Sequence, residues 1–243
     1  MTGLYPPRYG ETTNETKASK PKTVDGRYNC QRGFMESNVD HILISLVIQA
    51  GGKSSRMGEN KTLMHFLGVP LIQRVCERTK SIAREVLIVS NEPEELAFMD
   101  VRLVSDSIKG KGAIGGLYTA MDRASSAYVA VVACDLPFAS AAILDKGANL
   151  LEQTGADVAI PRLNGDFYEP LHAVYRRESC KNAILKAIQA DQRRLISWFP
   201  SVRVIEMDEV LCKQLDPSGL AFFNINNRED FLQAEQIELG KVN

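Results

Sequence analysis

The chain has 243 residues, of which 44% are hydrophobic and 24% are charged, and its formal net charge is -1. This length suits one folded domain with a full core, and the near-neutral charge gives no general signature of nucleic-acid or membrane-surface binding. The five cysteines form no CxxC pair, which argues against a disulfide framework or a zinc site. No apolar run approaches the roughly 18 residues that cross a bilayer, and no secretory signal is visible, so we expect a cytoplasmic protein.

The first part of the chain differs in composition from the rest. Residues 1–40 are rich in proline, glycine and polar side chains and show no sustained periodicity. Such a segment buries too little apolar surface to offset its ordering entropy, so we predict a disordered tail. Met35 precedes the first predicted strand, and we hypothesise that translation begins there. Residues 41–243 are predicted to form a single domain.

From residue 42 onward, short apolar strands alternate with amphipathic helices. Tyr128–Cys134, a run of β-branched and small apolar residues, has the strongest strand pattern. The strands are predicted at 42–48, 85–89, 102–104, 128–134, 156–160, 171–175 and 202–206, and the helices at 70–83, 114–124, 140–153, 178–190 and 228–238. This order predicts an α/β fold with one doubly wound, mainly parallel sheet and helices on both faces. Ligands bind beyond the carboxyl ends of the strands in such a sheet.

A glycine-rich, basic segment follows the first strand. It reads AGGKSSRMGENK over residues 50–61. Glycines let the backbone approach an anion, and Lys53, Arg56 and Lys61 add the positive charge that a triphosphate requires. The segment matches neither the Walker A loop nor the GxGxxG fingerprint, and an ordinary turn with solvated basic residues is the alternative. The three cations favour anion binding.

Two further polar clusters follow predicted strands. Residues 105–116 combine Asp106 with four glycines around the start of a helix, a pattern that permits close contact with a flat or charged ligand or forms a flexible turn. Asp135 follows the strand 128–134 and is fixed by Pro137, which suits either Mg²⁺ held jointly with substrate phosphates or a turn residue.

Three other segments have both structural and functional interpretations. In the sequence FFNINN (222–227), Asn227 is a candidate helix cap, and Asn224 is a turn residue or a ligand contact. His172 has no second histidine or cysteine at ligand spacing and is expected to be structural or solvent-facing. Trp198 is expected in the core.

The chain resembles the molybdenum cofactor guanylyltransferases, within the wider family of nucleotidyltransferases that share a Rossmann-like sheet of the nucleotide-diphospho-sugar transferase type. The resemblance runs from about Ile44 to the last helix. It rests on QAGGKSSRMGENK (49–61), VSDSIKGKGAIGGL (104–117), ACDLPF (133–138), EPLHAVY (169–175) and FFNINNREDF (222–231), in that order.

The resemblance implies roles for individual positions. Lys61, Arg56 and Asp135 are the expected catalytic residues, and Asp135 is expected to bind Mg²⁺ with Asn226 as a second ligand. Nucleotide binding is implied for Gln49, Ala50, Gly51, Gly52, Lys61, Asn91, Asp106 and Asp135, and acceptor binding for Arg56, Gly112, Asn224 and Asn226. Gln49, Asn60, Ala113 and Asn227 depart from the residues common in the family, and the first two bear on base selection and loop stability.

The implied reaction transfers GMP from GTP to the phosphate of molybdopterin or the molybdenum cofactor and releases pyrophosphate. The expected partners are these two substrates and cofactor-delivery proteins, without nucleic acid or membrane, and the protein is expected to be a monomer or a weak homo-oligomer. A cytidylyltransferase or another nucleotidyltransferase with a different phosphorylated acceptor is the first alternative. A non-catalytic nucleotide-binding module is the second.

Overall fold

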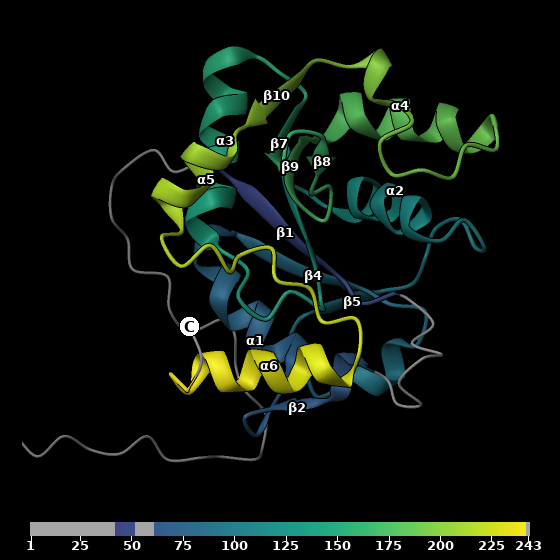
Figure 1. The fold of residues 1–243 in the computed structure, drawn as a ribbon. Helices are drawn as coiled ribbons and strands as arrows, with labels where there is room; N and C mark the ends of the chain where they lie inside the picture. Colours follow the sequence, from purple (N-terminus) through teal and green to yellow (C-terminus); the bar gives the residue numbers. More distant parts are fainter. Residues whose placement is uncertain (1–41, 52–60, 242–243) are drawn as a thin grey trace, which may run out of the picture.

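The computed structural model describes residues 42–51 and 61–241. The predicted tail and the alternative start at Met35 lie outside these residues, as do positions 52–60 of the glycine-rich segment. Within the described chain, the central sheet has eight strands and runs in the order β10-β7-β9-β6-β1-β4-β5, with β8 paired to β7 (Figure 1). The strands are β1 Ile44–Gln49, β4 Glu85–Val89, β5 Arg102–Val104, β6 Tyr128–Ala133, β7 Val158–Leu163, β8 Phe167–Tyr168, β9 His172–Arg176 and β10 Val204–Met207.

The predicted, mainly parallel sheet is confirmed, but one of its long strands runs in the opposite direction. β1 pairs in parallel with both β4 and β6, whereas β9 is antiparallel to β6 and to β7. The reversal starts at the short turn between β7 and β8, where Asn164 and Gly165 have φ values of 45° and 83°. Asn-Gly suits this left-handed turn geometry, which closes antiparallel hairpins. β9 therefore begins at the edge of the sheet where its neighbours β6 and β7 end.

Helices cover both faces of the sheet, as the alternation of strands and helices predicted. α1 (Leu71–Thr79) and α3 (Ala141–Thr154) pack on one face, where Leu46 and Ile48 point. α2 (Ala113–Arg123) and α4 (Arg177–Gln189) pack on the other, against Val47 and its neighbours (Figure 1). Successive residues of a strand face opposite sides, so the apolar run of β1 is buried in both layers.

Smaller elements complete the fold beside the strand ends. Lys61–Leu63 forms a 3-10 helix, η1, and leads into the hairpin of β2 (His65–Phe66) and β3 (Val69–Pro70). α5 (Glu209–Leu215) follows β10, and α6 (Arg228–Glu238) packs over the hairpin (Figure 1). Further 3-10 helices occupy Lys80–Ile82, Pro93–Leu96 and Phe199–Ser201. None of the helices in the described chain is long and apolar enough to span a bilayer.

Candidate functional site

The segments that follow the parallel strands are tied together at one edge of the sheet. The N–H of Ala50, just after β1, donates to the oxygen of Val89 over 2.8 Å, and the N–H of Cys134, just after β6, donates to the oxygen of Gln49 over 3.1 Å. These bonds continue the β ladders beyond the strand ends. The start of the glycine-rich segment and the Asp135 turn therefore lie side by side, as the strand pattern predicted.

Lys61 is anchored to the segment before α6. Its ammonium group donates to the main-chain oxygen of Ile225 over 3.0 Å. The N–H of Ile225 donates in turn to the main-chain oxygen of Asp135, also over 3.0 Å. Residues from three distant parts of the sequence are thus fixed around one point, and Ile225 itself is fully buried.

The Asp135 carboxyl group is held in a partly desolvated position. Burial raises its pKa, and the positive charge of Lys61 opposes this shift without cancelling it. Its Oδ1 atom is buried and has no hydrogen-bond partner among the described residues. A buried carboxylate oxygen without a hydrogen-bond partner destabilises the folded state. Such unpaired oxygens often mark a site that a ligand or metal ion completes.

A cavity of about 270 Å³, here called the Asp135 cavity, opens beside this carboxyl group. Its walls bring together four of the predicted site residues, Gln49, Gly51, Asp135 and Asn224. Asn226 does not line it, and its side-chain amide lies 3.4 Å from the main-chain oxygen of Asn224. In the described chain no three His, Cys, Asp or Glu side chains gather as a metal site.

Glu169 also lines the Asp135 cavity, although no sequence pattern singled it out as a site residue. β6 and β9 are antiparallel, with Val132 opposite His172. Asp135 follows β6 and Glu169 precedes β9, so both residues lie at the same end of this strand pair. Burial raises the pKa of Glu169, and the negative charge of Asp135 raises it further. Its one signal in the sequence is its place at the start of the EPLHAVY motif.

A second group of predicted residues lies beyond β4 and β5. The Asn91 side chain donates a hydrogen bond to the Asp106 carboxyl group, which lowers the pKa of that carboxyl, but burial outweighs this and the pKa is raised. Gly112 stands directly before α2 with φ 61°, a conformation that L side chains rarely adopt. Neither Asn91, Asp106 nor Gly112 lines the Asp135 cavity.

Gln49 joins the end of β1 to the first turn of α2. Its side-chain nitrogen donates to the oxygen of Ala113 over 3.0 Å, and only 6% of the residue is exposed. A Cβ atom at Gly116 would stand 1.8 Å from that nitrogen. The glycine therefore provides the space that the glutamine occupies.

The other predicted residues have mixed outcomes. Gly52 and Arg56 lie outside the described residues. His172 is fully buried, so its structural role is confirmed and the solvent-facing alternative is wrong. Trp198, at 3% exposure, is a core residue as expected. Asn227 caps α6 in a reciprocal capping box with Asp230.

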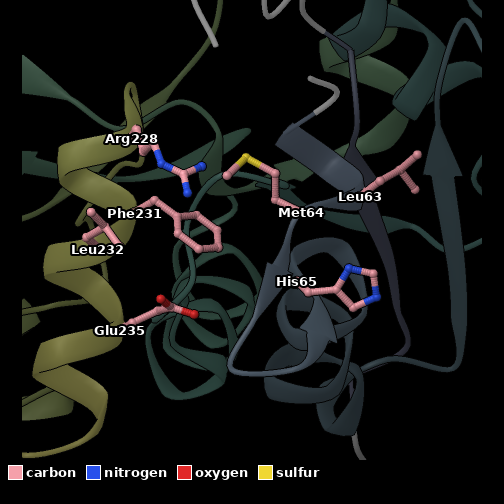
Figure 2. Close-up of a pocket in the computed structure, with 7 residues that line it drawn as sticks. All are labelled: Leu63, Met64, His65, Arg228, Phe231, Leu232 and Glu235. Atoms are coloured by element: carbon pink, nitrogen blue, oxygen red, sulfur yellow. The ribbon is translucent and has the colours of Figure 1, made fainter. Parts of the chain in front are cut away.

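A separate cavity of about 550 Å³ lies between α6 and the segment that follows Lys61 (Figure 2). Arg228 and Phe231 reach from α6 towards Met64 in this view. None of the predicted site residues lines this cavity. It is therefore distinct from the Asp135 cavity.

Comparison with known proteins identifies the family. The family model described as the MobA-like NTP transferase domain matches residues 46–204. This chain belongs to the MobA-like NTP transferase family. A protein of Pelotomaculum thermopropionicum named "Probable molybdenum cofactor guanylyltransferase" is 36% identical over 81% of this chain and 96% of its own length. The "Molybdenum cofactor guanylyltransferase" of Syntrophotalea carbinolica is 33% identical over 77% of this chain and 88% of its own length.

The solved structures agree with this membership of the MobA-like family. The molybdopterin-guanine dinucleotide biosynthesis protein A of Archaeoglobus fulgidus superposes with a TM-score of 0.72 and 26% identity, covering 81% of this chain and 99% of its own. Lys61, Asp106, Asp135 and Glu169 lie within the segment that the MobA-like model matches, and Asn224 lies after it.

Proposed function

We propose that this protein transfers GMP from GTP to the phosphate of molybdopterin and releases pyrophosphate. The convergence of Lys61, Asp135 and Gly51 at one edge of the sheet, beside a cavity, carries this proposal. Such an edge is where ligands bind in doubly wound folds, and the names of the relatives supply the substrates. A cytoplasmic location and the oligomeric state stay predictions.

The reaction needs little covalent chemistry from the protein. A substrate phosphate is already an anion near neutral pH and can attack the α-phosphorus of GTP in line, so no general base is required. Lys61 would neutralise charge on the phosphates, and the main chain around Gly51 would position them. The bond from Lys61 to Ile225 fixes the direction of the ammonium group before substrate arrives.

The proposed site fits Mg²⁺ by the chemistry of its donors. Mg²⁺ prefers carboxylate oxygen and usually keeps several ligands from water and substrate phosphates, so one carboxylate such as Asp135 can suffice as the protein's contribution. Asp135, with a buried oxygen that has no partner in the described chain, would hold it. When bound, Mg²⁺ supplies charge neutralisation on the phosphates. Asn226 stays the weaker candidate because it does not line the Asp135 cavity.

A nucleotide panel tests the proposal. Pyrophosphate release is measured with each of the four nucleoside triphosphates, molybdopterin as acceptor and Mg²⁺ present. We expect release with GTP that depends on both molybdopterin and Mg²⁺. Release with CTP alone would assign the protein to the cytidylyltransferases, and nucleotide binding without turnover would favour a non-catalytic module.

A further inference from the structure

A second cavity adjoins the Asp135 cavity on the side of α5. This α5 cavity has a volume of about 370 Å³, which is within the usual range for small-molecule sites. Glu169 lines both cavities, and Phe223 of the α5 cavity directly precedes Asn224 of the Asp135 cavity. The two spaces therefore meet at Glu169, and a ligand with its phosphate near Asp135 can extend into the α5 cavity.

The lining of the α5 cavity combines aromatic side chains with carboxyl groups. Phe222 and Phe223 provide an apolar wall of the cavity. Three acidic residues also line it: Glu169, Glu209 and Asp216. Flat heterocycles pack well against such aromatic walls, and their N–H groups need acceptors when they leave water. The excess of carboxyl groups over the single lysine of the lining, Lys213, disfavours a second triphosphate in this space.

Two of the three carboxyl groups already have partners. Glu209 forms an ion pair with Lys213 over 2.8 Å. The Asp216 oxygens accept hydrogen bonds from the Ser218 hydroxyl over 2.5 Å and from the N–H of Ala221 over 2.7 Å. Glu169 has no side-chain hydrogen bond or ion pair with any residue that the structure describes.

The backbone of Glu169 is fixed independently of its side chain. Its N–H donates to the oxygen of Pro161 over 3.1 Å, and its own oxygen accepts the N–H of His172 over 3.0 Å. The carboxyl group is thus held on a rigid main chain at the junction of the two cavities. A carboxylate without a partner among the described residues, carried on a fixed backbone, suits a ligand that presents N–H donors.

We propose that the α5 cavity binds the heterocycle of the acceptor, and that Glu169 recognises it by accepting hydrogen bonds from the N–H groups of its ring edge. This inference rests on the proposed function, because it takes the acceptor to be a pterin that carries a phosphate. The 2-amino-4-oxo edge of a pterin presents two neighbouring N–H donors, which match the two oxygens of a carboxylate.

Direct binding of a pterin phosphate to the full-length protein tests this inference. Neopterin monophosphate is titrated against the wild type and against Glu169→Gln, Glu169→Ala and Asp166→Asn, by pterin fluorescence and without GTP or metal. We expect both Glu169 variants to weaken binding by about tenfold or more, since a hydrogen bond to a charged acceptor is lost. Asp166→Asn is the control, because this carboxyl side chain is 92% exposed and does not line the α5 cavity, and it should bind within about twofold of the wild type.

Two further measurements separate the proposal from its rival, in which Glu169 serves the metal ion beside Asp135. GTP affinity and Mn²⁺ affinity, the latter by electron paramagnetic resonance, are determined for the same variants and should change by less than about twofold. The proposal is overturned if the wild type does not bind neopterin monophosphate, if Glu169→Gln binds it normally, or if Mn²⁺ affinity falls instead. Pyrophosphate release from GTP by the wild type decides the proposed function separately.

Discussion

Lys61 Nζ donates a hydrogen bond to the main-chain oxygen of Ile225 over 3.0 Å, although the two residues are 164 positions apart in the sequence. The fully buried Ile225 thus orients the ammonium group of Lys61 at the edge of the sheet where the parallel strands end. The segment before α6 is therefore part of the site even though it lies far from the glycine-rich loop. A side chain held in this way loses little freedom when it meets a phosphate.

Lys61→Met should lower kcat by about 100-fold or more, because it removes a preorganised positive charge from the proposed transition state. The apolar stem of methionine keeps most of the packing, but the main-chain oxygen of Ile225 loses its ammonium donor, so the melting temperature should fall by a few degrees, corresponding to about 1 kcal/mol. Steady-state kinetics with GTP and molybdopterin provide the measurement, and Lys61→Arg is the control that keeps the charge. A kcat within about threefold of the wild type would remove Lys61 from the proposed mechanism.

Asp135→Asn should abolish turnover and also stabilise the fold at pH 7. The pKa of Asp135 is raised by burial, so the native state binds its proton more tightly than the unfolded state does, and stability falls as the pH rises above the ordinary value of 3.8. The variant lacks this charge and should melt at a higher temperature than the wild type at pH 7. The difference in melting temperature between the variant and the wild type should vanish near about pH 3, where the carboxyl group of the wild type is protonated in both the native and the unfolded state.

The control for this change is Asp166→Asn, at a carboxyl side chain that is 92% exposed. It should leave both turnover and the melting temperature nearly unchanged. Calorimetry between pH 3 and about 7 checks the expected convergence. Retained turnover in Asp135→Asn would refute the proposed metal role, and an unchanged or lower melting temperature would contradict the desolvation argument.

Gly116→Ala should destabilise the protein by about 1–3 kcal/mol, because the new methyl group collides with the buried Gln49 side chain. The new Cβ would stand 1.8 Å from the Gln49 nitrogen, a distance too short to persist without movement. In a Gln49→Ala background the same substitution should be neutral or stabilising by up to about 1 kcal/mol, since alanine favours helices over glycine. Urea unfolding of the four proteins measures the coupling, and an equal cost in both backgrounds would exclude the collision.

Much of the fold could be predicted because its strands are buried runs of apolar, β-branched residues. β1, β4 and β6 lie within a residue or two of their predicted bounds. The reversed direction of β9 was not predicted, because strand direction depends on the turn geometry at Asn164 and Gly165 and not on the composition of the strand. α5, with seven residues, is too short for a clear periodic pattern.

The same reversal explains why the sequence indicated Asp135 but not Glu169. Polar residues that directly follow parallel strands lie at the edge of the sheet where these strands end, so the sequence pattern indicates them. An antiparallel strand presents its beginning at that edge, so its functional residue precedes the strand, as Glu169 precedes β9. The contact of Lys61 with Ile225 has a similar origin, because it depends on how the hairpin and α6 pack together and not on any local pattern.

His172 should make the protein lose stability in acid, and His172→Gln should reduce that loss. Its Nε2 atom accepts the N–H of Ser140 over 2.9 Å, which requires a neutral ring, and burial lowers its pKa from 6.5 to about 4. The unfolded state therefore binds more protons in this range, so stability falls as the pH drops from about 6.5 to about 4, by roughly 3 kcal/mol at most. A glutamine oxygen can accept the same N–H without titrating.

Denaturant unfolding at several pH values between about 7 and 4 measures the effect as a difference between wild type and variant. Taking the difference cancels the opposite contribution of Asp135, whose raised pKa favours the native state in acid. His65→Gln is the control, because His65 is exposed. If the free energy of unfolding of His172→Gln follows the same pH dependence as that of the wild type, the buried ring is not the group responsible. A weaker pH dependence in His172→Gln but not in His65→Gln assigns the acid sensitivity to the His172 ring that accepts the Ser140 N–H.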